Sequence, residues 1–194
     1  MNEGLILASR SPRRVELLRS AGVEVKVVVP EVKERPFRGE EPGEFALRVA
    51  TMKTREVART HPGSWILGAD TVVVLGERIL GKPEDEEEAK KMLRLLSGRE
   101  HRVITAYALL KADEGKSILD RCETRVKFIP LTEEEIAWYV STGEPMDKAG
   151  AYAIQGRGSF MVEWIEGSWT NVVGLPLAQV LRHLRELGIW RPRR

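Results

Sequence analysis

Hydrophobic residues recur along this chain with two different periods, which predicts strands interleaved with helices. Alternating or uninterrupted apolar positions predict strands, and an apolar position every three or four residues predicts helices. The predicted strands are residues 5–8, 23–27, 65–75, 101–111, 117–129 and 160–165. The predicted helices are residues 12–21, 42–60, 85–97, 132–142 and 177–187. This interleaved order is typical of an α/β protein with a mixed sheet.

Two segments within this pattern predict particular connections. The strands 101–111 and 117–129 are separated by a short stretch containing Asp113-Glu114-Gly115, which predicts a long hairpin. Residues 143–159 are polar and rich in glycine, and they predict a long loop without secondary structure, a kind of segment that is often functional. No composition break marks a linker, so we expect a single domain over residues 1–194, built as one body or as two closely packed lobes.

The composition limits the partners that the chain can have. With 31 Lys and Arg against 29 Asp and Glu, the net charge is +2, which gives little support to general nucleic-acid binding. No apolar run approaches the ~20 residues of a membrane-spanning helix, and the N-terminus lacks a signal-peptide pattern. The single cysteine, Cys122, has no partner for an intrachain disulfide. A cytoplasmic protein without a membrane partner is therefore predicted.

The first candidate site is the turn Ser9-Arg10-Ser11-Pro12-Arg13-Arg14, between the first predicted strand and the first helix. Backbone N–H groups and the helix dipole favour an anion at such a position. Arginine adds planar, bidentate contacts to phosphate. The turn therefore suits a phosphate chain, although a solvated basic turn explains the same residues equally well.

The second candidate is Asp70, a carboxylate inside an otherwise apolar strand. An unpaired buried charge is costly, so such a group normally has a cation, a metal or several hydrogen-bond donors as partners. Lys53 lies on the apolar stripe of its predicted helix and is either the partner of Asp70 or a phosphate ligand. A structural ion pair for Asp70 and a surface lysine with a buried stem for Lys53 are the alternatives.

The segment Gly76-Glu-Arg-Ile-Leu-Gly81-Lys82 matches the G-x-x-x-x-G-K pattern of a phosphate-binding loop. We reject that assignment, because the next residue is Pro83, which has neither the hydroxyl that holds Mg²⁺ nor a backbone N–H. The interior of the segment instead predicts a hairpin turn. Lys82 directly precedes a predicted helix and stays a candidate phosphate ligand.

A further candidate is Gln155, in the glycine-rich stretch 143–159. Its amide can both donate and accept hydrogen bonds, which suits the edge of a nucleic acid base. An ordinary connecting loop is the alternative. The three histidines are scattered along the sequence, so neither a Ser-His-Asp arrangement nor a zinc site is evident.

Taken together, these segments resemble the Maf family of nucleotide pyrophosphatases over nearly the whole chain. The motifs that carry the resemblance are LILASRSPRRVELL, LGADTVV, GKP, LSGREHRVITA, GEPMDKAGAYAIQG and NVVGLPL, in this order from Leu5 to Leu177. The resemblance implies a two-lobed α/β fold with a long curved mixed sheet, flanking helices and a cleft between the lobes. It also implies a divalent metal and, often, a homodimer.

The resemblance assigns roles to the candidate residues. Asp70 corresponds to the family's proton acceptor and a metal ligand, and Glu34 to a second metal ligand, although Lys33 stands where many members have aspartate. The positions that correspond to phosphate ligands are Ser9, Arg14, Lys53 and Lys82. The positions that divide the family by base preference are Arg13, Thr71 and Gln155, which are similar to the branch acting on dTTP and UTP.

The resulting hypothesis is a hydrolase that uses Mg²⁺ or Mn²⁺ and converts dTTP and UTP to the monophosphate and pyrophosphate. The metal and the cationic side chains position the triphosphate, and Asp70 accepts a proton from the attacking water. The family also implies a role in excluding modified nucleotides and in arresting cell division. Two alternatives are a nucleic-acid-binding regulator that uses the arginine turn and the basic tail Arg191-Pro-Arg-Arg194, and a nucleotide-sensing module without catalysis.

Overall fold

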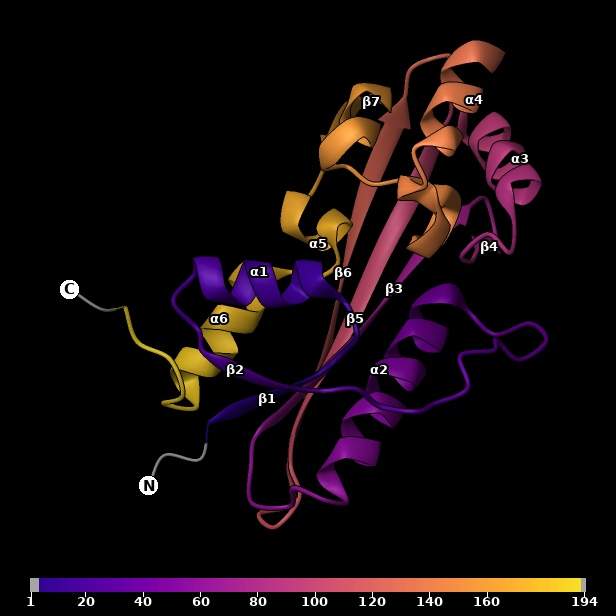
Figure 1. Ribbon diagram of the computed structural model, residues 1–194. Coiled ribbons are helices and arrows are strands. Elements are labelled where there is room, and N and C mark those ends of the chain that lie inside the picture. The colour runs from indigo at the N-terminus through magenta and orange to yellow at the C-terminus, as the bar shows by residue number, and fades with distance from the viewer. Residues whose placement is uncertain (1–3, 193–194) are drawn as a thin grey trace. The chain divides into compact units, whose positions relative to one another are not determined.

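The computed structural model describes residues 4–192 of the chain, and its strands and helices alternate along most of the sequence (Figure 1). The strands are β1 (Leu5–Ala8), β2 (Val25–Val28), β3 (Ile66–Leu75), β4 (Arg78–Leu80), β5 (Glu100–Lys111), β6 (Lys116–Phe128) and β7 (Val162–Glu166). The α-helices are α1 (Pro12–Ser20), α2 (Pro42–Ala58), α3 (Glu86–Leu96), α4 (Glu133–Ser141), α5 (Trp169–Val173) and α6 (Leu177–Glu186). The 3₁₀ helices are η1 (Glu144–Asp147), η2 (Ala149–Ala151) and η3 (Gly156–Met161).

The strands form a mixed sheet, which confirms the predicted α/β class with helices flanking the sheet. Within the described residues the sheet has seven strands in the order β2-β1-β3-β5-β6-β7, and β4 pairs with β3. Strand β1 runs parallel to both β2 and β3, so β1, α1 and β2 form a βαβ unit. Strands β4 and β7 pair antiparallel with their neighbours. The predicted hairpin is present as β5 and β6, which are neighbours in the sheet.

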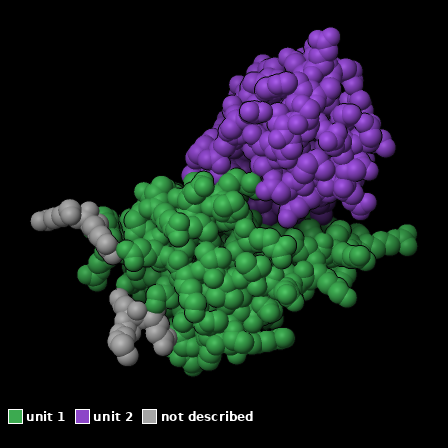
Figure 2. Space-filling model, viewed as in Figure 1, with its two compact units in different colours: residues 1–70, 105–122, 174–194 green, residues 71–104, 123–173 purple. Residues whose placement is uncertain are grey.

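The chain divides into two compact units, which are coloured separately in Figure 2. Unit 1 comprises residues 1–70, 105–122 and 174–194, and unit 2 comprises residues 71–104 and 123–173. Strands β3, β5 and β6 each contribute residues to both units. The single domain over residues 1–194 stays a prediction.

Unit 1 is built around a fully apolar strand. All four residues of β1 are buried, as expected for a strand with a parallel neighbour on each side. The helix α2 packs very closely against β3 at Gly68, where an added Cβ would lie 2.8 Å from the carbonyl oxygen of Ala50. This close approach requires a glycine. It also brings the apolar face of α2 next to the first part of β3, two residues before Asp70.

Unit 2 has its own core, formed by apolar residues of β3–β7, α3, α4 and the 3₁₀ helices. The prediction that residues 143–159 lack secondary structure is wrong, because this stretch contains η1, η2 and the first residues of η3. Its Tyr152 side chain is buried and shares a 2.7 Å hydrogen bond with the ring of His101. Gly150 takes a left-handed conformation and donates its N–H to the carbonyl oxygen of Gly81. These contacts fold a glycine-rich segment onto the core.

Two elements near the C-terminal end of the fold differ from the predicted ones. Helix α5 was not predicted from the sequence, and β7 begins at Val162 instead of residue 160. Within residues 4–192, no helix has the length and the apolar character that crossing a bilayer requires. The basic tail invoked by one alternative hypothesis ends at residues 193 and 194, which lie outside the described residues.

Candidate active site

In unit 1, one lysine side chain forms ion pairs with two carboxylates. The Lys53 Nζ lies 2.7 Å from Asp70 Oδ1 and 2.8 Å from Glu34 Oε1. Lys53 and Asp70 are only 7% and 6% exposed, while the Glu34 side chain is 43% exposed. The structure therefore brings together three of the residues that the sequence singled out, two of them buried and one at the surface.

Local sequence explains where these groups come from. Lys53 follows Phe45 and Val49 at four-residue spacing on the buried face of α2, so its side chain points toward the sheet. Asp70 lies in β3 within a run of buried residues. Glu34 comes from the segment 29–41 between β2 and α2, which has no helix or strand. The two buried groups are thus carried by regular elements and the exposed one by a loop.

Burial raises the pKa of the Asp70 carboxyl above its ordinary value, and the nearby charges of Lys53 and Arg14 oppose this rise only in part. The cause is the loss of hydration that a carboxylate undergoes in an apolar environment. A carboxylate with a raised pKa is a stronger base than a solvated one, which suits a proton acceptor. The paired lysine explains why Asp70 can be buried at all.

The arginine turn lies in the same unit. Ser9 and Arg14 are both buried, and Ser9 Oγ accepts hydrogen bonds from Arg14 Nη1 at 3.2 Å and from the Ser11 backbone N–H at 3.1 Å. Arg14 Nε donates to the carbonyl oxygen of Gly174 at 2.7 Å. Burial lowers the pKa of the Arg14 guanidinium, and the negative charge of Asp70 opposes this change. Arg14 is therefore held rigidly and interacts electrostatically with Asp70.

The N-terminus of α1 adds backbone donors to this turn. The helix begins at Pro12, as predicted, and Ser11 is its N-cap without a side-chain capping hydrogen bond. The first N–H groups of a helix have no partner within the helix, so they are available to an anion. Arg13 lies in the first turn of α1 and is half-buried. The predicted phosphate-binding character of this turn is chemically consistent with these observations.

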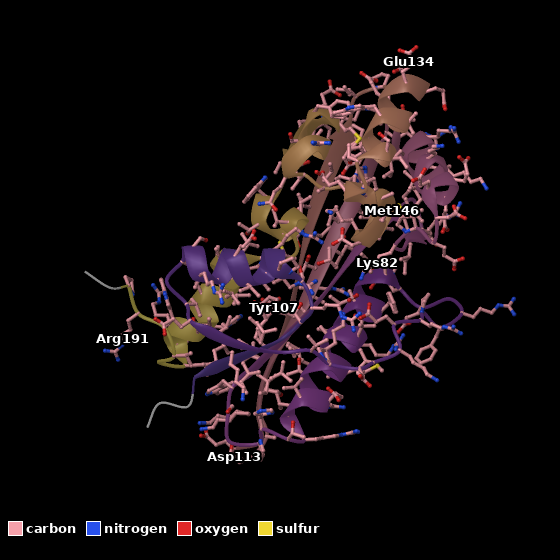
Figure 3. All side chains as sticks on the ribbon, viewed as in Figure 1. Lys82, Tyr107, Asp113, Glu134, Met146 and Arg191 are labelled. Atoms are coloured by element: carbon pink, nitrogen blue, oxygen red, sulfur yellow. The ribbon has the colours of Figure 1, made fainter. Side chains whose placement is uncertain are left out.

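In unit 2, the rejected phosphate loop forms a hairpin, as predicted, but its turn is shorter than predicted, because Arg78 and Ile79 belong to strand β4. Gly76 takes a left-handed conformation between β3 and β4, and Val74 pairs with Ile79 across the turn. Lys82 follows β4 and is exposed, and Figure 3 labels its side chain. The hydrogen bond between the Gly150 N–H and the Gly81 carbonyl, 2.9 Å long, fixes the backbone directly before Lys82.

Two of the residues predicted to set the base preference, Thr71 and Gln155, lie in unit 2, and both are half-buried. Thr71 follows Asp70 directly in β3. Gln155 is the N-cap of η3, and within residues 4–192 its side-chain amide makes no hydrogen bond. A half-buried amide in this state can pair with a ligand.

Two residues that sequence reasoning missed hold the backbone around Gln155. The Glu144 carboxylate accepts hydrogen bonds from Tyr139 Oη at 3.0 Å and from the backbone N–H groups of Arg157 and Gly158, each at 3.1 Å. Tyr139 Oη also accepts from the Ala153 N–H. Although burial raises the pKa of Glu144, these hydrogen bonds hold it below its ordinary value. The only sequence signal was a glutamate directly after the helix-ending Gly143.

The metal-binding prediction rests on two carboxylates. Among residues 4–192, no group of three or more His, Cys, Asp and Glu side chains is arranged for a metal ion. Glu34 and Asp70 nevertheless converge on one cation, the Lys53 ammonium. Mg²⁺ is commonly held by one or two carboxylates together with substrate phosphates. The two oxygen donors therefore fit a hard divalent ion that binds with a phosphorylated ligand.

Comparisons with known proteins find relatives over nearly the whole chain. The family model described as "Maf-like protein" matches residues 4–187. The dTTP/UTP pyrophosphatase of Geobacter sulfurreducens is 52% identical over 184 residues, which cover 95% of this chain and 96% of that protein. The dTTP/UTP pyrophosphatase of Symbiobacterium thermophilum is 50% identical over 184 residues, which cover 95% and 94%.

Among solved structures, a HAM1 protein from Coxiella burnetii matches with a TM-score of 0.53 and 16% identity. The match covers 94% of this chain and 98% of that one. At this identity the likeness shows the fold alone, and it agrees with the mixed sheet described above.

Proposed function

The chain belongs to the Maf family, and from this premise we propose that it hydrolyses dTTP and UTP to the nucleoside monophosphate and pyrophosphate. The observation that carries the proposal is the environment of Asp70. Its carboxyl is buried, burial raises its pKa, Lys53 forms an ion pair with it, and Arg14 interacts with it electrostatically. Relatives about half identical to the chain over nearly all of its length bear the name of this activity. A regulator without catalysis has no comparable support.

The proposed reaction is attack of a water oxygen on the α-phosphorus. The bond from the α-phosphorus to the oxygen that bridges to the β-phosphorus breaks, and pyrophosphate leaves. Asp70 accepts the proton that the water loses, which its raised pKa favours. Lys53, Arg14 and Ser9 bind phosphate oxygens in the proposal, as do the backbone N–H groups of the first turn of α1.

Further roles are proposed for residues that follow the family pattern. Lys82 binds oxygens of the triphosphate, and Gln155, Thr71 and Arg13 determine the preference for the pyrimidine base. An amide such as that of Gln155 offers both a donor and an acceptor to the edge of uracil or thymine.

We also propose that Asp70 and Glu34 hold Mg²⁺ or Mn²⁺. Such an ion, when bound, neutralises negative charge on the phosphate oxygens. The Lys53 ammonium compensates the same two carboxylates in the structure. The proposal places the enzyme in the cytoplasm, where nucleoside triphosphates are present. It includes no nucleic-acid or membrane partner, and the homodimer implied by the family is a further part of it.

The direct test is a panel of dTTP, UTP, CTP, GTP and 7-methyl-GTP assayed for pyrophosphate release in ¹⁸O-labelled water with and without Mg²⁺ or Mn²⁺. We expect dTTP and UTP to be preferred, a requirement for the metal, and the label in the monophosphate. Label in pyrophosphate or in free phosphate would assign the protein to a different class of phosphatase. Preference for a purine nucleotide would exclude the pyrimidine assignment.

A further inference from the structure

Helix α2 contributes an arginine, Arg48, that holds the segment 29–41, in which Glu34 lies. The proposed reaction includes no contact between Arg48 and the substrate. Arg48 Nη2 donates to the carbonyl oxygen of Arg35, the residue directly after Glu34, at 2.9 Å. Arg48 also binds the Glu40 carboxylate through two hydrogen bonds, Nε to Oε1 at 2.6 Å and Nη2 to Oε2 at 2.7 Å. All of these residues belong to unit 1.

The same arginine organises the far end of the segment. Its guanidinium lies 4.0 Å from the centre of the Phe37 ring. The Glu40 carboxylate accepts the Phe37 N–H at 2.9 Å, and the Glu40 N–H donates back to the Phe37 carbonyl. The hydrogen bonds from Arg48 hold the pKa of Glu40 below its ordinary value. Arg48, Phe37 and Glu40 therefore form one connected cluster that closes the loop.

The contacts of this cluster hold the loop in one conformation, because the loop has no regular secondary structure of its own. Within 29–41, neither helix nor strand is present, and most of its residues, Glu34 and Phe37 among them, are exposed. An exposed segment without regular structure is held in one conformation only by specific contacts. A bidentate arginine–carboxylate pair with an additional carbonyl contact is among the most directional contacts that side chains make.

Apart from the contacts of Arg48 with Glu40 and Phe37, the loop is fixed to α2 at two points near Glu34. One point is the ion pair between Lys53 and Glu34, and the other is the contact between Arg48 and the Arg35 carbonyl. The ion pair between Lys53 and Glu34 is lost when Lys53 binds a phosphate instead, or when a metal ion takes the place of the ammonium beside the carboxylates. The second point involves no group that binds substrate, so it persists.

We propose that Arg48 is a positioning residue that holds Glu34 at the site while Lys53 exchanges its partners. This inference rests on the proposed function for its effect on turnover, but its effect on the loop does not depend on the reaction. Positioning of this kind reduces the motion that must be lost when the substrate and its metal bind.

The test compares Arg48→Met with Arg55→Met. Arg55 is on the same helix, two turns further along, and is exposed, with no side-chain partner among the described residues. We expect Arg48→Met to weaken Mn²⁺ binding to the metal-free protein and to lower kcat/KM, each by about 10–100-fold, as for other residues that orient metal ligands. Hydrogen exchange should become faster in residues 29–41, at the Phe37 N–H above all. Arg55→Met should change none of these quantities.

A double-mutant cycle decides whether the effect passes through Glu34. In a Glu34→Gln background, Arg48→Met should lower Mn²⁺ affinity and kcat/KM by no more than about twofold, because Arg48 then has no carboxylate left to position and the two substitutions are not additive. A full additional loss in that background would overturn the proposal, because Arg48 would then act on another part of the site. Unchanged exchange in 29–41 would also overturn it.

Two controls separate the possible failures. Arg48→Lys keeps a cation beside Glu40 but cannot form the fork to both Glu40 and the Arg35 carbonyl, so it should show the faster loop exchange with a smaller risk of unfolding. If the wild type hydrolyses neither dTTP nor UTP, the proposed function fails. Loop exchange and Mn²⁺ affinity still decide whether Arg48 positions Glu34.

Discussion

Replacing Asp70 with asparagine distinguishes a catalytic carboxylate from a structural ion pair. The substitution conserves the shape of the side chain and removes its charge. The amide oxygen of the new side chain can still accept a hydrogen bond from Lys53. Lys53 also keeps its ion pair with Glu34 at 2.8 Å, so no buried cation is left without a counter-charge.

The expected effect on stability follows from the pKa of Asp70. Because burial raises this pKa in spite of Lys53, the ionised carboxylate is less favourable in the folded than in the unfolded chain. Removing the charge should therefore leave the free energy of unfolding at pH 7 unchanged or raise it by up to about 2 kcal/mol, since replacing buried ion pairs is often neutral or stabilising. Turnover should fall by ~10²–10⁴-fold, typical for a lost general base, or about 2.7–5.4 kcal/mol in the barrier.

The sign of the pH dependence gives an independent check. Between the unfolded pKa of aspartate, about 3.9, and the higher pKa of folded Asp70, the folded wild type binds more protons than the unfolded chain. The contribution of Asp70 to the free energy of unfolding of the wild type therefore decreases as the pH rises between these two pKa values. The stability of Asp70→Asn relative to the wild type should increase with pH there and become constant above it.

Urea unfolding, followed by tryptophan fluorescence and circular dichroism with EDTA from pH 4 to 8, measures this difference. Steady-state kinetics with saturating Mg²⁺ measures turnover. Asp113→Asn is the matched control, because Asp113 lies on the exposed turn between β5 and β6 and is labelled in Figure 3. Near wild-type turnover of Asp70→Asn would remove Asp70 from the mechanism. A loss of more than about 3 kcal/mol in stability, the usual result of breaking a buried structural pair, would refute the reasoning about its burial.

Three further substitutions test other parts of the site. Lys53→Met leaves two carboxylates facing each other and should lower the free energy of unfolding by about 3–5 kcal/mol in EDTA, with part of the loss recovered in Mn²⁺; equal stability with and without metal would contradict this. Gln155→Glu should reduce kcat/KM for dTTP and UTP, by about 0.5–1.5 kcal/mol for each lost hydrogen bond, and an unchanged ranking of nucleotides would exclude Gln155 from base selection. Glu144→Gln weakens the acceptor of the Arg157 and Gly158 N–H groups. It should raise KM for dTTP by the equivalent of about 1 kcal/mol and leave kcat unchanged, which steady-state kinetics measures.

The parts of the fold that the sequence predicted are those with a local physical cause. Pro12 begins α1, and the side chains of Asp85 and Thr132 cap the N-termini of α3 and α4 by accepting backbone N–H groups three residues further along. The prediction for residues 143–159 was wrong because the conformation of this stretch depends on contacts with residues distant in the sequence. The contacts of Gly150 with Gly81 and of Tyr152 with His101 span more than 50 residues of sequence, and composition alone contains no trace of them.

The candidate site shows the same division. Asp70 and Lys53 could be found because each is a charged residue at a position whose pattern demands an apolar one, and such an exception on a rigid element needs a partner. Glu34 breaks no pattern, since it is an exposed glutamate in a polar segment, and only the family resemblance identified it. Glu144 was missed for the same reason.

This difference explains why the site depends on a residue as inconspicuous as Arg48. Side chains on β3 and α2 are positioned by the packing of the unit 1 core, so their geometry follows from the same apolar contacts that stabilise the fold. A side chain such as Glu34 on an irregular loop has no such support and requires separate contacts, which are made here by an arginine, a glutamate and a phenylalanine that is 65% exposed. Such contacts add less to overall stability than the apolar core does, because the Arg48 and Glu40 side chains are still 25% and 12% exposed, and ion pairs that water reaches contribute modestly. We therefore expect substitutions in this cluster to change metal binding and turnover much more than the free energy of unfolding, which is the opposite of what substitutions in the core of unit 1 should do.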